Sequence, residues 1–176
     1  MTSTHCEIAQ LGAVVLRQLA THVPDVHHAS VQQLIKDMHT VLSSSEGVGL
    51  AAPQIGVSQQ LVIIASRPTK RYPLAPTMSP TVMINPSFQT LSDNTAKDWE
   101  GCLSIPGIRA LVPRYTDIMI HYTNQYGVNI ILHAQDFVAR VFQHEYDHLN
   151  GMVYLDRVES TADIMAESEY FKLLLH

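Results

Sequence analysis

The clearest chemical signal in the sequence is the pattern H-E-x-x-H at residues 144–148. We expect a helix here, and at 3.6 residues per turn His144 and His148 lie one above the other on one face. Both imidazoles can therefore reach a single metal ion. Glu145 lies beside the pair, where it can serve a water at the metal rather than bind the metal itself. Chance gives about 0.02 occurrences of this pattern in such a chain.

The alternative for this segment is two surface histidines on an ordinary helix. Phe137 and Val141 lie on the same helical face, seven and three residues before His144, so the polar residues continue an apolar stripe. Polar side chains on such a face are costly unless they bind something. We therefore favour a metal site.

Two histidines leave a catalytic metal site one protein ligand short. HExxH metallopeptidases usually take a later Glu or His, and this chain offers Glu159, Glu167, Glu169 and His176. None of these belongs to a recognisable second motif. Upstream, Cys102 lies in the segment EGCLS and can bind as a thiolate, although a lone cysteine is more often a small buried hydrophobe. From the residues alone, the third ligand stays open.

A third segment, GVGLAAPQIG at residues 47–56, is dense in glycine and alanine. Such density is typical of a backbone that approaches another group closely. An ordinary turn between a helix and a strand would also account for it.

Together, these segments resemble the peptide deformylase family. GVGLAAPQIG, EGCLS and QHEYDHLNG match the three motifs of the family in the same order and with similar spacing. The resemblance begins with IAQLGAVVLRQLA and covers most of residues 7–156. The proline-rich stretch at residues 66–80 and the C-terminal tail match poorly.

The resemblance implies that Cys102, His144 and His148 ligate one divalent metal ion, with water in the fourth position. Fe²⁺ is the usual metal of the family in the cell, and Zn²⁺, Ni²⁺ or Co²⁺ can replace it. A thiolate ligand makes the metal a softer Lewis acid than three neutral ligands would.

The resemblance also implies an activity, the removal of the N-formyl group from the N-terminal formyl-methionine of newly synthesised proteins, with release of formate. Glu145 would take a proton from the water and later protonate the departing amine. The Gln54 side-chain amide and the Leu103 backbone N–H would hold the developing oxyanion together with the metal. Such donors supply about 3–4 kcal/mol each in comparable sites.

For the substrate, the resemblance implies an extended peptide that pairs by strand addition with residues 48–50 and 99–101. Strand addition uses hydrogen bonds to the backbone of the peptide, so peptides of many sequences can bind in this way. The methionine side chain needs an apolar pocket, although plain core packing is an equally good account of each candidate. The residues assigned to substrate binding are Val48, Gly49, Gly101, Arg109, Phe137 and Val141.

Three charged residues near the motifs have roles that the sequence does not decide. Arg109 either holds the peptide or stabilises the local fold. Arg140 lies one helical turn before His144 and is a candidate charge at the rim of the site. Asp147 either supports a ligand from outside or is a solvated helix charge.

Composition limits the partners. The net charge is −5 and the chain has no basic run, which argues against direct nucleic-acid binding and against a polybasic membrane anchor. Apolar runs such as residues 61–65 are far shorter than the roughly 20 residues that span a bilayer. The expected partner is a nascent N-formyl-methionyl polypeptide, with the ribosome as a second candidate.

Two cysteines, Cys6 and Cys102, cannot form a disulfide framework in a chain of 176 residues, and Cys6 lies outside all three motifs as a free thiol. The first 19 residues do not have the pattern of a signal or transit peptide. We therefore expect a cytoplasmic protein.

Hydrophobic periodicity predicts the elements that position these residues. We expect helices at residues 30–45, 136–150 and 163–175, the first opened by a capping box of Ser30 and Gln33. Expected strands lie at residues 61–65, 82–85 and 88–91, followed by a hairpin over residues 118–132. The four prolines within residues 66–80 predict a loop.

These elements predict an α+β fold, with mostly antiparallel strands in small sheets around a central helix that carries HExxH, and with a C-terminal helix. The length fits one catalytic domain spanning residues 1–176. Two other functions are kept open. A zinc metallopeptidase of the HExxH type would differ in its third ligand, and an inactive paralogue would bind formyl-peptides without turnover.

Overall fold

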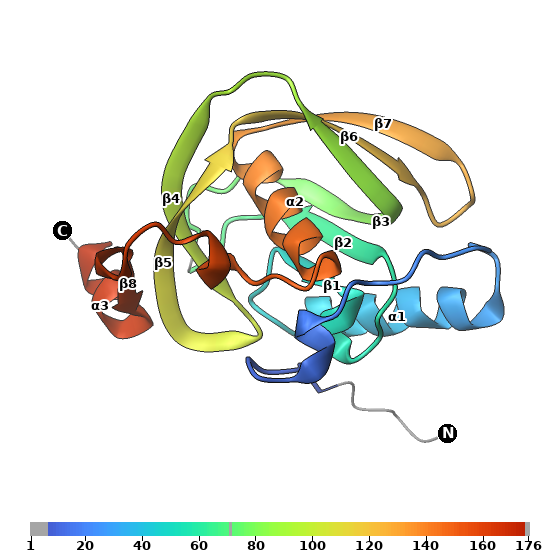
Figure 1. Ribbon diagram of the computed structural model, residues 1–176, viewed down its shortest axis with the longest axis horizontal. Coiled ribbons are helices and arrows are strands. Elements are labelled where there is room, and N and C mark those ends of the chain that lie inside the picture. Colours follow the sequence, from blue (N-terminus) through green and yellow to red (C-terminus); the bar gives the residue numbers. More distant parts are fainter. Residues whose placement is uncertain (1–6, 71, 175–176) are drawn as a thin grey trace.

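The computed structural model describes residues 7–70 and 72–174. The central helix α2 (Asp136–Leu149) lies between two antiparallel sheets (Figure 1). One sheet has five strands in the order β1-β2-β3-β6-β7, and the other has three in the order β4-β5-β8. The predicted α+β class, with small antiparallel sheets around the HExxH helix, is confirmed. Cys6 and His176 lie outside the described residues.

The strands of the larger sheet are β1 (Gly49–Ala51), β2 (Leu61–Ser66), β3 (Met78–Thr90), β6 (Asp117–Thr123) and β7 (Asn129–Gln135). The smaller sheet consists of β4 (Thr95–Cys102), β5 (Ile105–Tyr115) and β8 (Ile164–Ala166). Besides α2, the α-helices are α1 (Ala29–Ser43) and α3 (Glu167–Leu173). Within the part of the chain that the structure describes, four short 3₁₀ helices cover Val14–Arg17, Ala52–Ile55, Tyr154–Arg157 and Thr161–Asp163.

Helix α2 is buried along most of its length because it packs against both sheets. Val141 and Phe142 join the core formed with β2, β3 and β6. On its other side the helix contacts β5 and the 3₁₀ turn that begins at Ala52. A helix buried on several sides holds its side chains in fixed positions, which suits residues that must converge on one ion.

The N-terminal end of α1 differs from the expected capping box. His28 is the N-cap, and its Nδ1 accepts a hydrogen bond from the Ser30 backbone N–H at 3.3 Å. Gln33 instead donates to Asp37, one turn further along, at 2.9 Å. Histidine thus provides the cap acceptor that serine was expected to provide.

Two expected strands around Pro86 are one continuous strand, β3. The pairing register of β3 with β6 shifts between Ile84 and Ser87, and Asn85 has a positive φ of 50°. This bulge accommodates the proline without ending the strand. Because β3 already begins at Met78 and contains Pro80, the expected loop over residues 66–80 is too long at its end.

The hairpin of β4 and β5 was not expected from the sequence. Its turn is short, since Cys102 pairs with Ile105. At the C-terminus, the expected helix over residues 163–175 is also wrong at its start, because residues 164–166 form β8 on the edge of β5 before α3 begins. The hairpin of β6 and β7 and the strand β2 are confirmed. Within the described residues no helix is long and apolar enough to cross a membrane.

Candidate metal centre

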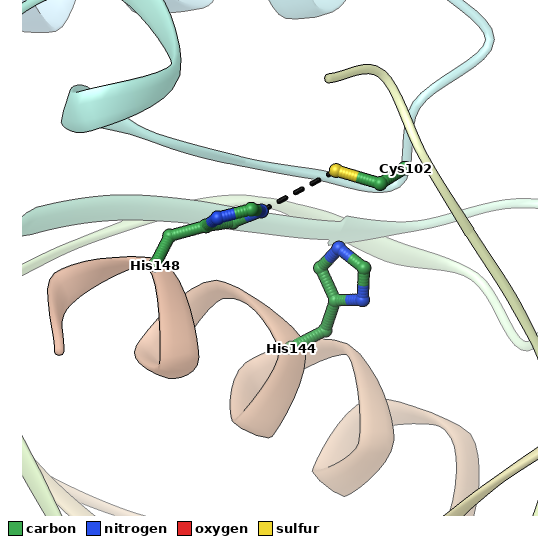
Figure 2. Close-up of side chains that lie close together, drawn as sticks. All are labelled: Cys102, His144 and His148. Atoms are coloured by element: carbon green, nitrogen blue, oxygen red, sulfur yellow. Dashed lines mark hydrogen bonds between the residues drawn. The ribbon is translucent and has the colours of Figure 1, made fainter. Parts of the chain in front are cut away.

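Cys102, at the end of β4, faces His144 and His148 on α2 (Figure 2). The potential ligand atoms of the three residues lie within 4.8 Å of one another, and all three residues are buried. Cys102 Sγ is 3.4 Å from His148 Nε2. The two imidazole rings are 5.2 Å apart, as expected for residues one helical turn apart.

The orientation of His144 is set by Glu100, which lies two residues before Cys102 on the same strand. Nδ1 of His144 is 2.9 Å from Oε2 of Glu100. A carboxylate at Nδ1 leaves Nε2 free for a metal, and it raises the basicity of the ring. Sequence analysis quoted Glu100 only as part of a motif and gave it no role.

Glu100 is held by two arginines from different elements. Arg114 on β5 donates to both carboxylate oxygens, at 2.9 and 3.0 Å, and Arg140 on α2 donates to Oε1 at 2.9 Å. Burial alone would raise the pKa of Glu100, but the Arg114 charge and the hydrogen bonds from His144 and Arg114 hold that pKa well below its ordinary value.

Arg140 and Asp147 are therefore buried network residues. Arg140 also donates to the backbone oxygens of Val112 and Ala96, each at 2.7 Å, so the interpretation as a rim charge is wrong. Asp147 accepts from Arg114 at 2.6 Å and from Arg157 at 2.8 Å, which rules out a solvated helix charge. The network thus extends from His144 through Glu100 and Arg114 to Asp147.

The environment of Cys102 favours its thiolate. Burial alone would raise the pKa of the thiol, but the neighbouring His148 charge and the hydrogen bonds to both histidines hold it well below its ordinary value. The Ser104 backbone N–H also points at Sγ, at 3.4 Å. A buried thiolate with two imidazoles is a suitable donor set for a first-row divalent metal.

Glu145 points into the same pocket from α2. Burial raises the pKa of its carboxyl to about 7, and Oε2 is buried with no hydrogen-bond partner among the described residues. Gly49 makes this position possible, because a Cβ on Gly49 would come within 2.8 Å of the Glu145 carboxyl carbon. A carboxylate with one unpartnered oxygen beside three converging ligand atoms fits a site completed by a metal and water.

Gln54 approaches from the opposite wall, in the 3₁₀ turn after β1. Its Oε1 accepts from the Ala51 backbone N–H at 2.8 Å, which turns the amide nitrogen toward the site. That nitrogen lies 3.4 Å from Cys102 Sγ and 3.3 Å from Ser104 Oγ. Gln54 therefore presents a neutral donor next to the candidate ligands.

The pocket brings together most of the residues that sequence analysis assigned to substrate binding. Its lining includes Val48, Gly49, Gly101, Phe137 and Val141, together with Leu103, whose backbone was assigned to the oxyanion. Arg109 is fully buried and is not part of this lining, but a Cβ on Gly101 would come within 2.9 Å of its Cδ, and its Nη1 donates to the Tyr72 hydroxyl at 3.1 Å. Tyr72 also lines the pocket but was not predicted, because nothing distinguishes it within the proline-rich stretch.

The downstream acidic residues considered as a third ligand lie elsewhere. Glu159 pairs with Lys97, Glu167 with Arg109, and Glu169 with Lys172. Among the described residues, the cluster suited to a metal contains Cys102.

The sequence was compared with family models and with known proteins. Residues 5–163 match the family model described as "Polypeptide deformylase". The chain is 50% identical over 167 residues to "Peptide deformylase 2" of Nostoc sp., covering 95% of this chain and 93% of that protein. It is 44% identical to "Peptide deformylase 2" of Ralstonia nicotianae, over 86% of each chain.

Solved structures agree with these matches. A Met-Ala-Ser-bound class I type b peptide deformylase from Acinetobacter baumannii superposes with a TM-score of 0.85 at 36% identity, covering 89% of this chain and all of that one. A peptide deformylase from Synechococcus elongatus in complex with actinonin gives a TM-score of 0.80 at 34% identity, covering 93% of this chain and 84% of that one.

Proposed function

This chain belongs to the peptide deformylase family, and we propose which of its residues carry out the deformylation. The enzyme removes the N-formyl group from the N-terminal formyl-methionine of newly synthesised proteins and releases formate. The observation that carries the proposal is the convergence of Cys102, His144 and His148 opposite Gln54 and beside Glu145.

Cys102, His144 and His148 hold one divalent metal ion. When bound, the metal supplies Lewis acidity toward the formyl carbonyl and makes water a nucleophile at neutral pH. Fe²⁺ is our proposal for the metal in the cell, with Zn²⁺, Ni²⁺ and Co²⁺ as replacements, because a thiolate with two imidazoles accepts all four. Glu100 keeps the His144 ring in the ligating orientation.

Glu145 moves the protons of the reaction. Its carboxylate takes a proton from the attacking water and gives it to the amine nitrogen as the C–N bond of the formamide breaks. In the metal-free protein, burial raises the pKa of this carboxyl to about 7, which makes it a stronger proton acceptor than an ordinary carboxylate. The Gln54 amide and the Leu103 backbone N–H donate to the formyl oxygen as it gains charge, and the bond from Ala51 holds the Gln54 amide in this orientation.

The peptide lies between the two sheets. β1 and β4 are the outer strands of their sheets, and both border the pocket at Gly49 and Gly101. An extended peptide can therefore pair with both strands. The methionine side chain enters the apolar part of the pocket, between Val48, Phe137 and Val141. Arg109 supports this groove from below, since it packs directly against Gly101.

We further propose that residues 1–176 form one catalytic domain that works in the cytoplasm on nascent chains, with the ribosome as a partner. The absence of a membrane-spanning helix among the described residues accords with this placement.

The direct test uses metal-free protein reconstituted under anaerobic conditions with Fe²⁺, Ni²⁺ or Zn²⁺. We expect one metal per chain and formate release from formyl-Met-Ala-Ser, with acetyl-Met-Ala-Ser left intact as the control substrate. Cleavage of internal peptide bonds without formate would instead support the metallopeptidase alternative. Among the downstream candidates that the structure describes, Glu159, Glu167 and Glu169 all have other partners, which weighs against that alternative.

A further inference from the structure

Residues 9–11, near the N-terminus, are hydrogen-bonded to both walls that carry the proposed oxyanion donors. The Ala9 backbone N–H donates to the Gln54 backbone oxygen at 2.8 Å. Two residues further along, the Leu11 backbone N–H donates to the Ser104 backbone oxygen at 2.9 Å. Residues 9–11 do not line the pocket, and no step of the reaction described above uses them.

The two walls come from distant parts of the chain. Gln54 lies in the 3₁₀ turn after β1, whereas Leu103 and Ser104 form the turn between β4 and β5. Gln10 adds a bond to this second turn, because its Nε2 donates to the Leu103 backbone oxygen at 3.4 Å and to the Ile8 backbone oxygen at 3.1 Å. A stretch of three residues therefore joins both turns.

These bonds bear directly on the Leu103 N–H. A backbone has two soft torsions per residue, so the direction of an N–H within a short turn depends on how the neighbouring peptide planes are held. On one side, Cys102 is held by its pairing with Ile105. On the other side, the carbonyls of Leu103 and Ser104 are held by residues 9–11.

The Gln54 donor is held at two points. The Ala51 backbone N–H binds the side-chain oxygen at 2.8 Å, and Ala9 binds the backbone oxygen of the same residue. Displacement of a reacting group by about 1 Å can cost about 10²-fold in rate, so the relative position of the two donors matters. We propose that residues 9–11 position the Gln54 amide and the Leu103 N–H relative to one another; this inference rests on the proposed function.

The local turn permits a variant that removes a single donor. The Ala13 backbone N–H donates to the Gln10 backbone oxygen at 2.9 Å, and Gly12 has a φ of +105°. A positive φ at the third position is typical of a type II turn, whose second position, here Leu11, favours proline. Leu11→Pro therefore removes the N–H that binds Ser104 and keeps the turn.

The experiment measures single-turnover formate release from formyl-Met-Ala-Ser by the metal-loaded protein, together with KM and metal content. We expect Leu11→Pro to lower the single-turnover rate by about tenfold, with KM within about threefold and one metal per chain retained. Leu11→Ala is the matched control, because it keeps the N–H and removes only a side chain that is 47% exposed. Its rate should stay within about twofold of wild type.

A second pair of variants leaves the backbone unchanged. Gln10→Leu removes the bond to Leu103 and should lower the single-turnover rate by about threefold. Gln60→Leu is its control, since Nε2 of Gln60 donates to the Ala20 backbone oxygen at 3.3 Å, a contact of the same kind away from both donors. This variant should keep the wild-type rate.

Equal rates in Leu11→Pro and Leu11→Ala would overturn the positioning role alone. A lower rate in Leu11→Pro that disappears when it is expressed per bound metal would do the same, because residues 9–11 would then act on the metal ligands. If Leu11→Pro does not fold, the glutamine pair decides, and equal rates in Gln10→Leu and Gln60→Leu would overturn the proposal. No formate from the wild-type protein would overturn the proposed function itself.

Discussion

Oε2 of Glu100 lies 2.9 Å from Nδ1 of His144, while the other oxygen of the same carboxylate accepts from Arg140 at 2.9 Å. Glu100 belongs to the strand that carries Cys102, whereas Arg140 belongs to the helix that carries both histidines. This carboxylate therefore links the two elements whose separation decides whether three ligand atoms can meet on one ion. The ligand cluster depends on a buried charge network as well as on its own residues.

Replacing Arg140 with Met should test this link. The change removes one donor to Glu100 and one donor to each of the Ala96 and Val112 carbonyls, which should destabilise the protein by about 3 kcal/mol. Because the hairpin is then less firmly held on α2, we expect metal affinity to fall by about 10- to 100-fold. Metal dissociation and the visible spectrum of the Co²⁺ form provide the measurements.

Gln143→Met is the matched control for Arg140→Met. Gln143 lies on the same helix and binds the backbone of Tyr115 on the same strand β5, but does not touch Glu100. It should lower the free energy of unfolding with little change in metal affinity. An equal loss of affinity in both variants would show that Arg140 acts only through general stability.

Glu145→Gln should abolish turnover while the fold and the metal are retained. Glu145 is assigned the proton transfers and is not a ligand, and such roles are commonly worth about 10²–10⁴ in rate. Formate release and metal content of the same preparation give the answer. Near-normal activity in this variant would refute the assignment of the proton transfers.

Glu145 should also make the stability of the metal-free protein depend on pH. Its pKa of about 7 in the folded protein lies above the ordinary value of 4.5, so the folded state holds this proton more tightly than the unfolded state does. The contribution of Glu145 to stability is therefore present below about pH 4.5 and is lost as pH rises through 7. The loss amounts to at most about 3–4 kcal/mol, from roughly 1.4 kcal/mol for each pKa unit.

Glu145→Gln cannot ionise and provides the reference for this effect. Urea unfolding of both metal-free proteins at pH 5 and pH 8 should show wild type losing stability relative to the variant at the higher pH. A constant difference between the two proteins at both pH values would mean that Glu145 titrates normally.

Local motifs made the core of this site predictable. H-E-x-x-H needs only helical spacing to bring His144 and His148 together, and the spacing held because α2 is regular. The charges around the motif were not predictable in the same way. The sequence left Arg140 as a candidate rim charge and left Asp147 open between supporting a ligand and a solvated helix charge. Their partners, Glu100 and Arg114, come from a hairpin far away in sequence.

The fold shows the same division between local and distant determinants. The hairpin of β4 and β5 was missed because Pro106 and Pro113 interrupt the pattern of a strand, although both lie within β5. Pro113 pairs with Lys97 at a position where the backbone N–H and C=O of Lys97 point away from β5. The missing N–H of the proline therefore removes no hydrogen bond between β4 and β5. Similarly, β8 becomes a strand only because the edge of β5 is available to residues 164–166.

Cys102→Ser tests the identity of the third ligand. A serine hydroxyl is a harder and far weaker ligand than the thiolate that this environment favours, because it is not ionised near neutral pH. Changes outside the ligand shell commonly cost 10- to 100-fold in affinity, so loss of a ligand should cost at least about 100-fold, with Fe²⁺, Ni²⁺ and Zn²⁺ affected unequally. Competition with a chelator measures each affinity, and the Co²⁺ spectrum should lose its thiolate charge-transfer band.

The Gln54 amide and the Ser104 N–H, which both point at Sγ, remain in place in this variant, so the fold should be retained. A Cys102→Ser protein that binds metal and releases formate like wild type would make this cysteine structural and would require the third ligand to be sought elsewhere.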